Sequence, residues 1–284
     1  MLEIETGVAI VAASYWGARK AQEKLKIQWL RDEDAPLSSA DISELYHQKA
    51  QENNDSSKRS DGDVDAAFDS AHKILEFEFE APFLAHATME PMNCTAHVQD
   101  GKADIWTGTQ APDIAQVAAA KVCDVSLSDV TIHNQFIGGG FGRRLTQDFV
   151  AEAAAISEIS QQPIKLIWSR EEDTQRDWYR PSSYHKLSAS IDKAGNISGW
   201  NHQMAGSGVF DYFVADAAPA QYPFMPKFMY GLLESAGKMG EGIIAPADGS
   251  IYEGAEAIPY DFANINVDYK KCPAAKGWLV KISD

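Results

Sequence analysis

The chain has 284 residues, of which 45% are hydrophobic and 23% charged, a composition typical of a folded protein and unlike that of a disordered or fibrous one. Lys and Arg number 25 against 41 Asp and Glu, so the formal net charge is −16. This balance argues against nucleic acid or an anionic membrane surface as the main partner. No apolar run approaches the roughly 20 residues of a membrane span, so we also expect no span.

The cysteines and the first residues exclude further kinds of site and signal. The three cysteines form no CxxC pair, so neither a zinc ribbon nor a thioredoxin-like redox site is expected. The sequence begins Met-Leu-Glu-Ile-Glu, without the basic-then-apolar order of a secretion signal. These features leave the compartment of the protein open.

The first 50 residues predict a small α/β unit. Strand patterns are expected at 8–13 and 26–30, and helix patterns at 18–25 and 41–50. From 51 to 65 the sequence turns polar and is expected to form an exposed linker or loop, where we place a domain boundary.

Beyond that boundary the pattern is α+β, with hairpins interleaved among helices. Asp100-Gly101 joins two alternating runs, and residues 192–196 join two more, both strong hairpin signals. Strands are expected at 73–80, 93–98, 102–106, 129–137, 164–168, 185–191 and 197–203, and helices at 114–122 and 148–160. Residues 204–284 crowd aromatic side chains without a regular period, which fits a coil packed on a core, a substrate-facing loop or a surface for a further domain.

The most informative segment is QFIGGGFGRR at 135–144, between a predicted strand and a predicted helix. Glycines let the backbone approach a ligand closely, and free N–H groups at a helix start attract anions. The dinucleotide pattern GxGxxG and the phosphate-loop pattern both fail at Arg143. The residues alone therefore leave open a phosphate-bearing cofactor site and a simple tight turn.

Two further segments contain residues able to carry chemistry. In TGTQAP at 107–112, Thr109 or Gln110 can cap the helix that follows. In HATMEPMN at 86–93, Glu90 is either a perturbed carboxylate or a structural hydrogen-bond anchor. The histidines are expected as isolated strand or core residues, and the HExxH and GxSxG motifs are absent.

Taken in this order, HATMEPMN, TGTQ and FIGGGFGRR resemble the molybdenum hydroxylases of the xanthine dehydrogenase and aldehyde oxidase type. They are most like the large, beta subunit of isoquinoline 1-oxidoreductase and related bacterial aldehyde dehydrogenases. The resemblance implies that 1–50 form part of a small α/β hammerhead domain and that 51–65 form a polar linker or loop. It implies that 66–284 form the first half of a molybdopterin-binding domain with mixed sheets and hairpins.

The resemblance also implies an oxidoreductase that hydroxylates an aldehyde or N-heterocycle with oxygen from water. Molybdenum would be carried by a pterin cofactor, expected in its cytosine dinucleotide form, and no side chain is expected to bind the metal. Gln110 matches a glutamine that hydrogen-bonds an oxo ligand of the metal and is the expected catalytic residue. Electrons would pass to [2Fe-2S] clusters on a small partner subunit. The expected cofactor-binding residues are Gly139, Gly140, Phe141, Gly142 and Arg143.

The chain also departs from this family. The family's large subunits are much longer and carry a glutamate general base in a Gly-rich segment near the C-terminus, which Glu241 matches poorly. We therefore expect a fragment that depends on the remaining part of the large subunit and is inactive alone. Two other interpretations stay open, a noncatalytic remnant of the fold and a nucleotide-dependent oxidoreductase or transferase using the turn at 138–142.

Overall fold

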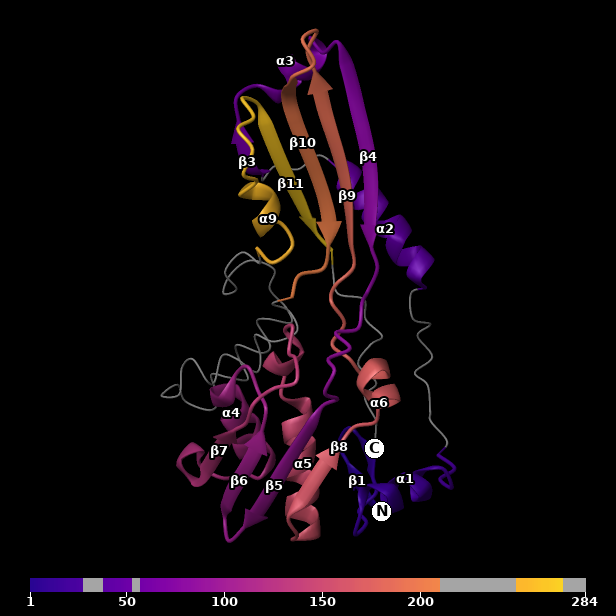
Figure 1. Cartoon of the computed structure of the whole chain (residues 1–284), viewed down its shortest axis with the longest axis vertical. Coiled ribbons are helices and arrows are strands. Elements are labelled where there is room, and N and C mark those ends of the chain that lie inside the picture. The colour runs from indigo at the N-terminus through magenta and orange to yellow at the C-terminus, as the bar shows by residue number, and fades with distance from the viewer. Residues whose placement is uncertain (28–37, 53–56, 210–248, 273–284) are drawn as a thin grey trace.

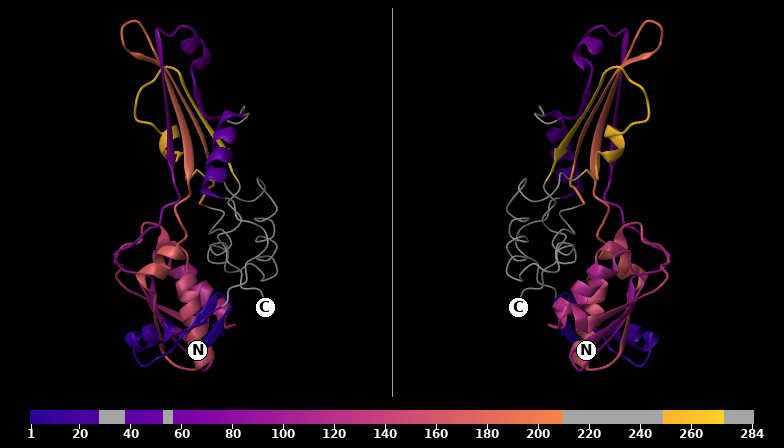
Figure 2. Two further views of the ribbon diagram at one scale, coloured as in Figure 1. Left: turned by 90° about the vertical axis from the view of Figure 1, so that its right-hand side faces the viewer. Right: turned by 90° about the vertical axis from the view of Figure 1, so that its left-hand side faces the viewer.

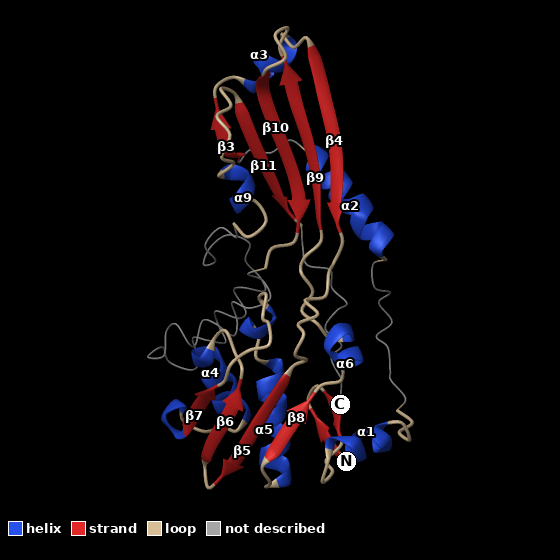
Figure 3. Cartoon of the chain, viewed as in Figure 1, coloured by secondary structure: helices blue, strands red, loops and turns tan. Residues whose placement is uncertain are grey.

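Two β-sheets lie one beyond the other along the long axis of the molecule (Figure 1). The structure is a computed structural model that describes residues 1–27, 38–52, 57–209 and 249–272. Both side views in Figure 2 show the same separation into an upper and a lower lobe. Figure 3 shows that each lobe contains both helices and strands. The expected α+β class with mixed sheets and hairpins is confirmed.

The upper lobe is built on a five-stranded sheet of order β3-β11-β10-β9-β4. Its strands are β3 (Ser57–Asp61), β4 (Lys73–Ala81), β9 (Ser183–Ile191), β10 (Ile197–Gly206) and β11 (Ile265–Lys271). Strand β11 runs parallel to β10, and the other neighbours are antiparallel. Helix α2 (Ser39–Gln51) packs on β9 and β10, and the short helices α3 (Val64–Asp69) and α9 (Glu253–Glu256) complete the lobe.

The lower lobe is built on a four-stranded sheet of order β7-β6-β5-β8. Its strands are β5 (Asn93–Gln99), β6 (Lys102–Thr107), β7 (Val130–Asn134) and β8 (Ile164–Ile167), and its helices are α4 (Pro112–Val122), α5 (Asp148–Ser160) and α6 (Arg170–Gln175). The main core lies between this sheet and the helices α4 and α5, where small alanines let the helices approach closely. Phe149 and Trp168 are its large aromatic members.

The first 50 residues contact both lobes. Strands β1 (Leu2–Ile4) and β2 (Gly7–Ala9) pair with each other, and helix α1 (Tyr15–Gln22) follows them. Thr6 Oγ1 donates to Glu152 Oε1 over 2.6 Å, which ties this hairpin to α5 of the lower lobe. Helix α2 instead packs on the upper sheet, with Tyr46 and Ala50 buried. A single domain over 1–50 stays a prediction.

The two sequence-predicted hairpins are confirmed. The β5–β6 turn places Asp100 and Gly101 at φ 52° and 73°, the left-handed conformations that an Asp-Gly turn adopts readily. Asp192 closes the β9–β10 turn by accepting hydrogen bonds from the backbone of Ala194 and Asn196, each over 2.8 Å.

The expectation of a linker or loop across 51–65 is wrong for Ser57–Asp61. These residues form β3, which pairs with β11 in the upper sheet. Its side chains are polar because it is an edge strand that remains largely exposed to solvent. The expected strand at 8–13 is shorter than predicted and ends at Ala9. Most of the expected strand at 26–30, the aromatic run at 210–230 and Glu241 lie outside the described residues.

Two chain segments cross between the lobes side by side. One leads from β4 to β5 and the other from α6 to β9. Leu84 and Arg180 join the crossings by a pair of backbone hydrogen bonds, of 3.3 Å from Leu84 N and 2.9 Å from Arg180 N. This bridge fixes the two crossing segments relative to each other. The glycine-rich loop, residues 135–142, approaches the first of them at His86.

Candidate cofactor-binding site

The glycine-rich loop connects β7 to α5 and turns sharply at two points. Gly139 and Gly142 have φ values of 101° and 103°, which glycine adopts without strain. Phe141 has φ 54°, a conformation that a bulky residue adopts only when its surroundings enforce it. Because its ring is 70% exposed, packing of the ring inside the protein does not explain this backbone conformation. The loop is therefore built to a fixed backbone shape with an aromatic side chain left outside.

Close approach of other segments requires glycine at two positions of the loop. A Cβ atom on Gly138 would lie 2.5 Å from Glu90 Cβ, and one on Gly140 would lie 2.4 Å from Gln110 Oε1. Both distances are far shorter than van der Waals contact. The absence of side chains thus allows Glu90 and Gln110 to pack directly against the loop backbone.

Gln110 lies at the turn between β6 and α4 and holds the loop by its side chain. Its Oε1 accepts a hydrogen bond from Gly142 N over 3.1 Å, and its backbone N donates to Arg144 O over 3.1 Å. The side chain is exposed, and its Nε2 donates to none of the described residues. With Oε1 assigned to Gly142 N, the amide presents two N–H donors outward. The structure therefore brings Gln110 into contact with the loop at Gly140 and Gly142.

Glu90 anchors the other side of the loop. Its Oε2 accepts hydrogen bonds from Gly138 N over 2.8 Å and from Arg144 Nη2 over 2.9 Å, and its Oε1 accepts one from Asn93 over 2.9 Å. Burial raises the pKa of Glu90, but these donors and the Arg144 charge outweigh it, so the net pKa lies below its usual value. Of the two interpretations of Glu90, the structure supports the hydrogen-bond anchor.

The two arginines after the loop point into the protein. Arg144, with a side chain 0% exposed, donates to the carbonyl oxygens of Gly139 and Gly108, each over 2.9 Å. The Arg143 guanidinium donates to both carboxylate oxygens of Asp148, each over 3.0 Å, and packs against the ring of Trp168. Both guanidinium groups brace the loop from behind. Arg143 as a cofactor ligand stays a prediction, which these internal contacts do not favour.

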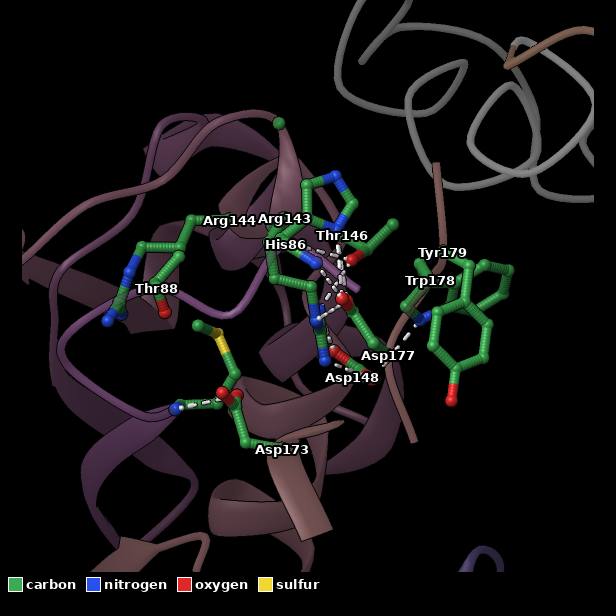
Figure 4. Close-up of polar contacts among 12 residues, drawn as sticks. His86, Thr88, Arg143, Arg144, Thr146, Asp148, Asp173, Asp177, Trp178 and Tyr179 are labelled. Carbon is green, nitrogen blue, oxygen red and sulfur yellow. Dashed lines mark hydrogen bonds and ion pairs between the residues drawn. The ribbon is translucent and has the colours of Figure 1, made fainter. Parts of the chain in front are cut away.

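His86 and Asp177 form a buried pair beside Arg143 that sequence reasoning missed (Figure 4). The residues are 91 positions apart, so spacing carries no signal for them. The expectation that the histidines are isolated is also wrong for His185 and His202, whose ring nitrogens lie 3.1 Å apart. The hairpin register, which sets Met204 opposite His185, is the signal from which that pair could have been found.

The donor set at the loop fits a cofactor rather than a bare metal ion. None of the described residues accepts a hydrogen bond from the N–H groups of Gly139, Gly140 and Phe141 or from the Gln110 amino group. Among the described residues, no cluster of three His, Cys, Asp or Glu could hold a metal ion. Backbone and amide donors suit the oxygens of an anionic organic cofactor, which would carry its own metal.

A glycine-rich loop between a strand and a helix is typical of a cofactor-binding domain. The family of molybdopterin cofactor-binding domains matches residues 46–221, and the chain belongs to this family. The match extends from α2 to beyond β10 and contains Gln110 and the whole glycine-rich loop.

Curated relatives are oxidoreductases, and this chain is part of an oxidoreductase family. It is 32% identical over 207 residues to the membrane-bound aldehyde dehydrogenase [pyrroloquinoline-quinone] of Gluconacetobacter polyoxogenes, covering 71% of this chain and 26% of the relative. It is 28% identical over 215 residues to isoquinoline 1-oxidoreductase subunit beta of Brevundimonas diminuta, covering 72% and 28%. The chain thus spans about a quarter of the length of these relatives.

Solved structures show the same fold. The aldehyde oxidoreductase of Desulfovibrio gigas superimposes with a TM-score of 0.53 at 19% identity, covering 69% of this chain and 22% of that one. Quinoline 2-oxidoreductase of Pseudomonas putida 86 gives 0.53 at 16% identity, covering 69% and 26%. Among the described residues, no helix is both long and apolar enough to cross a membrane.

Proposed function

We propose that this chain is the first cofactor-binding half of a molybdenum hydroxylase, which oxidises an aldehyde or N-heterocycle with oxygen taken from water. The observation that carries the proposal is the contact of Gln110 with the glycine-rich loop. Its Oε1 accepts a hydrogen bond from Gly142 N, and its amino group donates to none of the described residues. Fixed donors of this kind stabilise charge that changes during a redox reaction.

Each part of the site has a defined task in this proposal. The bound molybdenum–pterin group would supply the two-electron redox chemistry. The N–H groups of Gly139, Gly140 and Phe141 would bind that group, and the Gln110 amide would orient it. Glu90 and Arg144 keep the loop backbone in place while redox charge changes beside it. The Phe141 ring, which is exposed in this chain, would cover one side of the bound group.

The remaining functions belong to other polypeptide segments. This chain spans about a quarter of its curated relatives, so the rest of the large subunit would supply the general base and the other side of the cofactor site. A small subunit with [2Fe-2S] clusters would accept the electrons. We propose the cytosine dinucleotide form of the cofactor, and no catalysis by the isolated chain. The name of one relative, the aldehyde dehydrogenase of Gluconacetobacter polyoxogenes, includes pyrroloquinoline quinone, which is the competing cofactor.

Isotope labelling of the product tests the reaction class. The native assembly that contains this chain would be purified from its source and incubated with aldehydes and N-heterocycles in ¹⁸O-labelled water, with an artificial electron acceptor. We expect ¹⁸O in the hydroxylated ring of the N-heterocycle, the product that reports on the reaction class because an aldehyde exchanges its oxygen with water without the enzyme. An assembly of full molybdenum content that turns over none of these substrates would contradict the proposal and favour a noncatalytic remnant. In the active assembly, Gln110→Ala should lower turnover at unchanged molybdenum content, and unchanged turnover would refute its assigned role.

A further inference from the structure

His86 and Asp177 lie opposite each other where the two crossing segments meet the lower lobe. His86 Nδ1 is 3.1 Å from both carboxylate oxygens of Asp177, and the backbone N of His86 also donates to this carboxylate. The side chains are 8% and 2% exposed, so water competes little for these contacts. The imidazole is therefore held in one orientation by two bonds to the same group.

The carboxylate is fixed in turn from its other side. Arg143 Nε lies 3.0 Å from Asp177 Oδ1, an ion pair whose geometry is not that of a hydrogen bond. Asp148 binds the far end of the same guanidinium. A carboxylate beside Nδ1 selects the tautomer with the proton on Nδ1. The neutral ring then has an unprotonated Nε2, which is a hydrogen-bond acceptor.

The acceptor nitrogen faces the glycine-rich loop. Figure 4 shows one ring nitrogen turned to Asp177 and the other turned away from it. A Cβ atom on Gly142 would lie 3.6 Å from Nε2, and no described residue hydrogen-bonds to this atom. The backbone N of Gly142 is the group that binds Gln110 Oε1. His86 Nε2 and the Gln110 amide therefore flank the same end of the loop.

We propose that His86 is a ligand-contacting residue of this site, whose Nε2 accepts a hydrogen bond from an N–H group of the bound cofactor. The inference rests on the proposed function. It adds an acceptor side chain to the donors described for the loop and Gln110. Because none of the described residues hydrogen-bonds to Nε2, a ligand N–H group can take this position beside Gly142.

Two substitutions of His86 distinguish a role of Nε2 in ligand binding from a role of the side chain in folding. His86→Asn keeps an amide donor near the Nδ1 position for Asp177 but removes Nε2, whereas His86→Gln reaches toward the Nε2 position. The matched control is His133→Asn, because His133 Nε2 binds Asp104 over 2.9 Å in a pair that is 37% and 47% exposed on the surface. Thermal unfolding of each variant reports whether it folds.

The readout is molybdenum and pterin per chain in the native assembly after gel filtration. We expect His86→Asn to retain about tenfold less cofactor, the effect of losing one well-formed hydrogen bond to a charged or polarised group. His86→Gln should recover part of this loss, and His133→Asn should match the wild type. Equal retention in wild type and His86→Asn would overturn the inference while leaving the proposed function intact.

A second measurement, of the His86 tautomer, does not depend on the cofactor content of the assembly. In the chain labelled with ¹⁵N-histidine, the ring nitrogen shifts should show His86 protonated on Nδ1 and unprotonated on Nε2, and Nε2 should shift when cofactor is bound. A proton on Nε2 in the neutral ring would overturn the inference whatever the cofactor content. A wild-type assembly without molybdenum or pterin would overturn the proposed function, and the ligand assigned to His86 with it.

Discussion

Arg144 Nη2 lies 2.9 Å from Glu90 Oε2 and bridges two segments that are 54 residues apart in the chain. The same carboxylate oxygen accepts the N–H of Gly138, so one ion pair fixes the start of the glycine-rich loop. The Arg144 side chain is 0% exposed and that of Glu90 is 38% exposed. The pair is thus a structural support of the site, and it is open to direct tests.

Removing the charge of this carboxylate should destabilise the fold. Glu90→Gln leaves the buried Arg144 guanidinium without its counter-charge, and we expect the free energy of unfolding to fall by about 2 kcal/mol. This loss of stability is smaller than that expected for a fully buried ion pair, because Glu90 is partly solvated. Urea denaturation measures the change. Glu171→Gln, at an exposed carboxylate that pairs with Arg19 over 3.4 Å, should change the free energy of unfolding much less than Glu90→Gln does.

The effect of Glu90→Gln should depend on pH in one direction. The pKa of Glu90 is lowered in the folded chain, so its contribution is full above its usual value of 4.5 and is lost as the pH falls through the lower folded value. The stability difference between wild type and variant should therefore shrink below pH 4.5. Denaturant titrations at several pH values measure it, and a difference that grows toward acid would contradict the assignment.

Adding a methyl group to the glycine-rich loop at Gly138 should lower the free energy of unfolding. In Gly138→Ala the new Cβ would meet Glu90 Cβ at 2.5 Å, an atom close to the backbone that moves only with its segment. We expect a loss of about 2 kcal/mol in unfolding free energy. Gly254→Ala in α9 is the control, because nothing lies within 4 Å of its added Cβ, and it should be neutral or slightly stabilising. Equal effects of the two substitutions would show that the loop has room.

The paired histidines of the upper sheet should make stability sensitive to acid. The pKa of His202 is lowered to about 4, mainly by burial and to a smaller extent by the neighbouring His185. Protonation therefore favours the unfolded chain, so stability should fall as the pH decreases from 6.5 through about 4. For this partly exposed group we expect a loss of about 2 kcal/mol. His202→Gln should flatten this part of the profile, and His133→Gln should leave it unchanged.

Local patterns predicted much of the fold. The Asp100-Gly101 turn, helices α4 and α5 and the alternation in β4 depend on near neighbours, so short windows of sequence were sufficient. Strand β3 was missed because it is polar and pairs with β11, about 200 residues away along the chain. Such a pairing leaves no mark in the local sequence.

The candidate site was predictable only in part. The glycines and Gln110 were predicted from motifs, and the structure brings them into contact. The inward direction of the Arg143 side chain was not predicted. The carboxylate of Asp177 that helps to hold it lies 34 residues further along the chain. An arginine beside a glycine-rich loop has the same sequence signal whether it binds a ligand or braces the loop, and tertiary contacts decide between the two.

The cofactor content of the native assembly tests the central claim most directly. The assembly would be affinity-purified through this chain, and molybdenum, pterin and pyrroloquinoline quinone would each be measured per chain. Our account predicts molybdenum and pterin in equal amounts, release of a cytidine nucleotide on hydrolysis, and no pyrroloquinoline quinone. Pyrroloquinoline quinone in place of molybdenum and pterin, or none of the three, would contradict it.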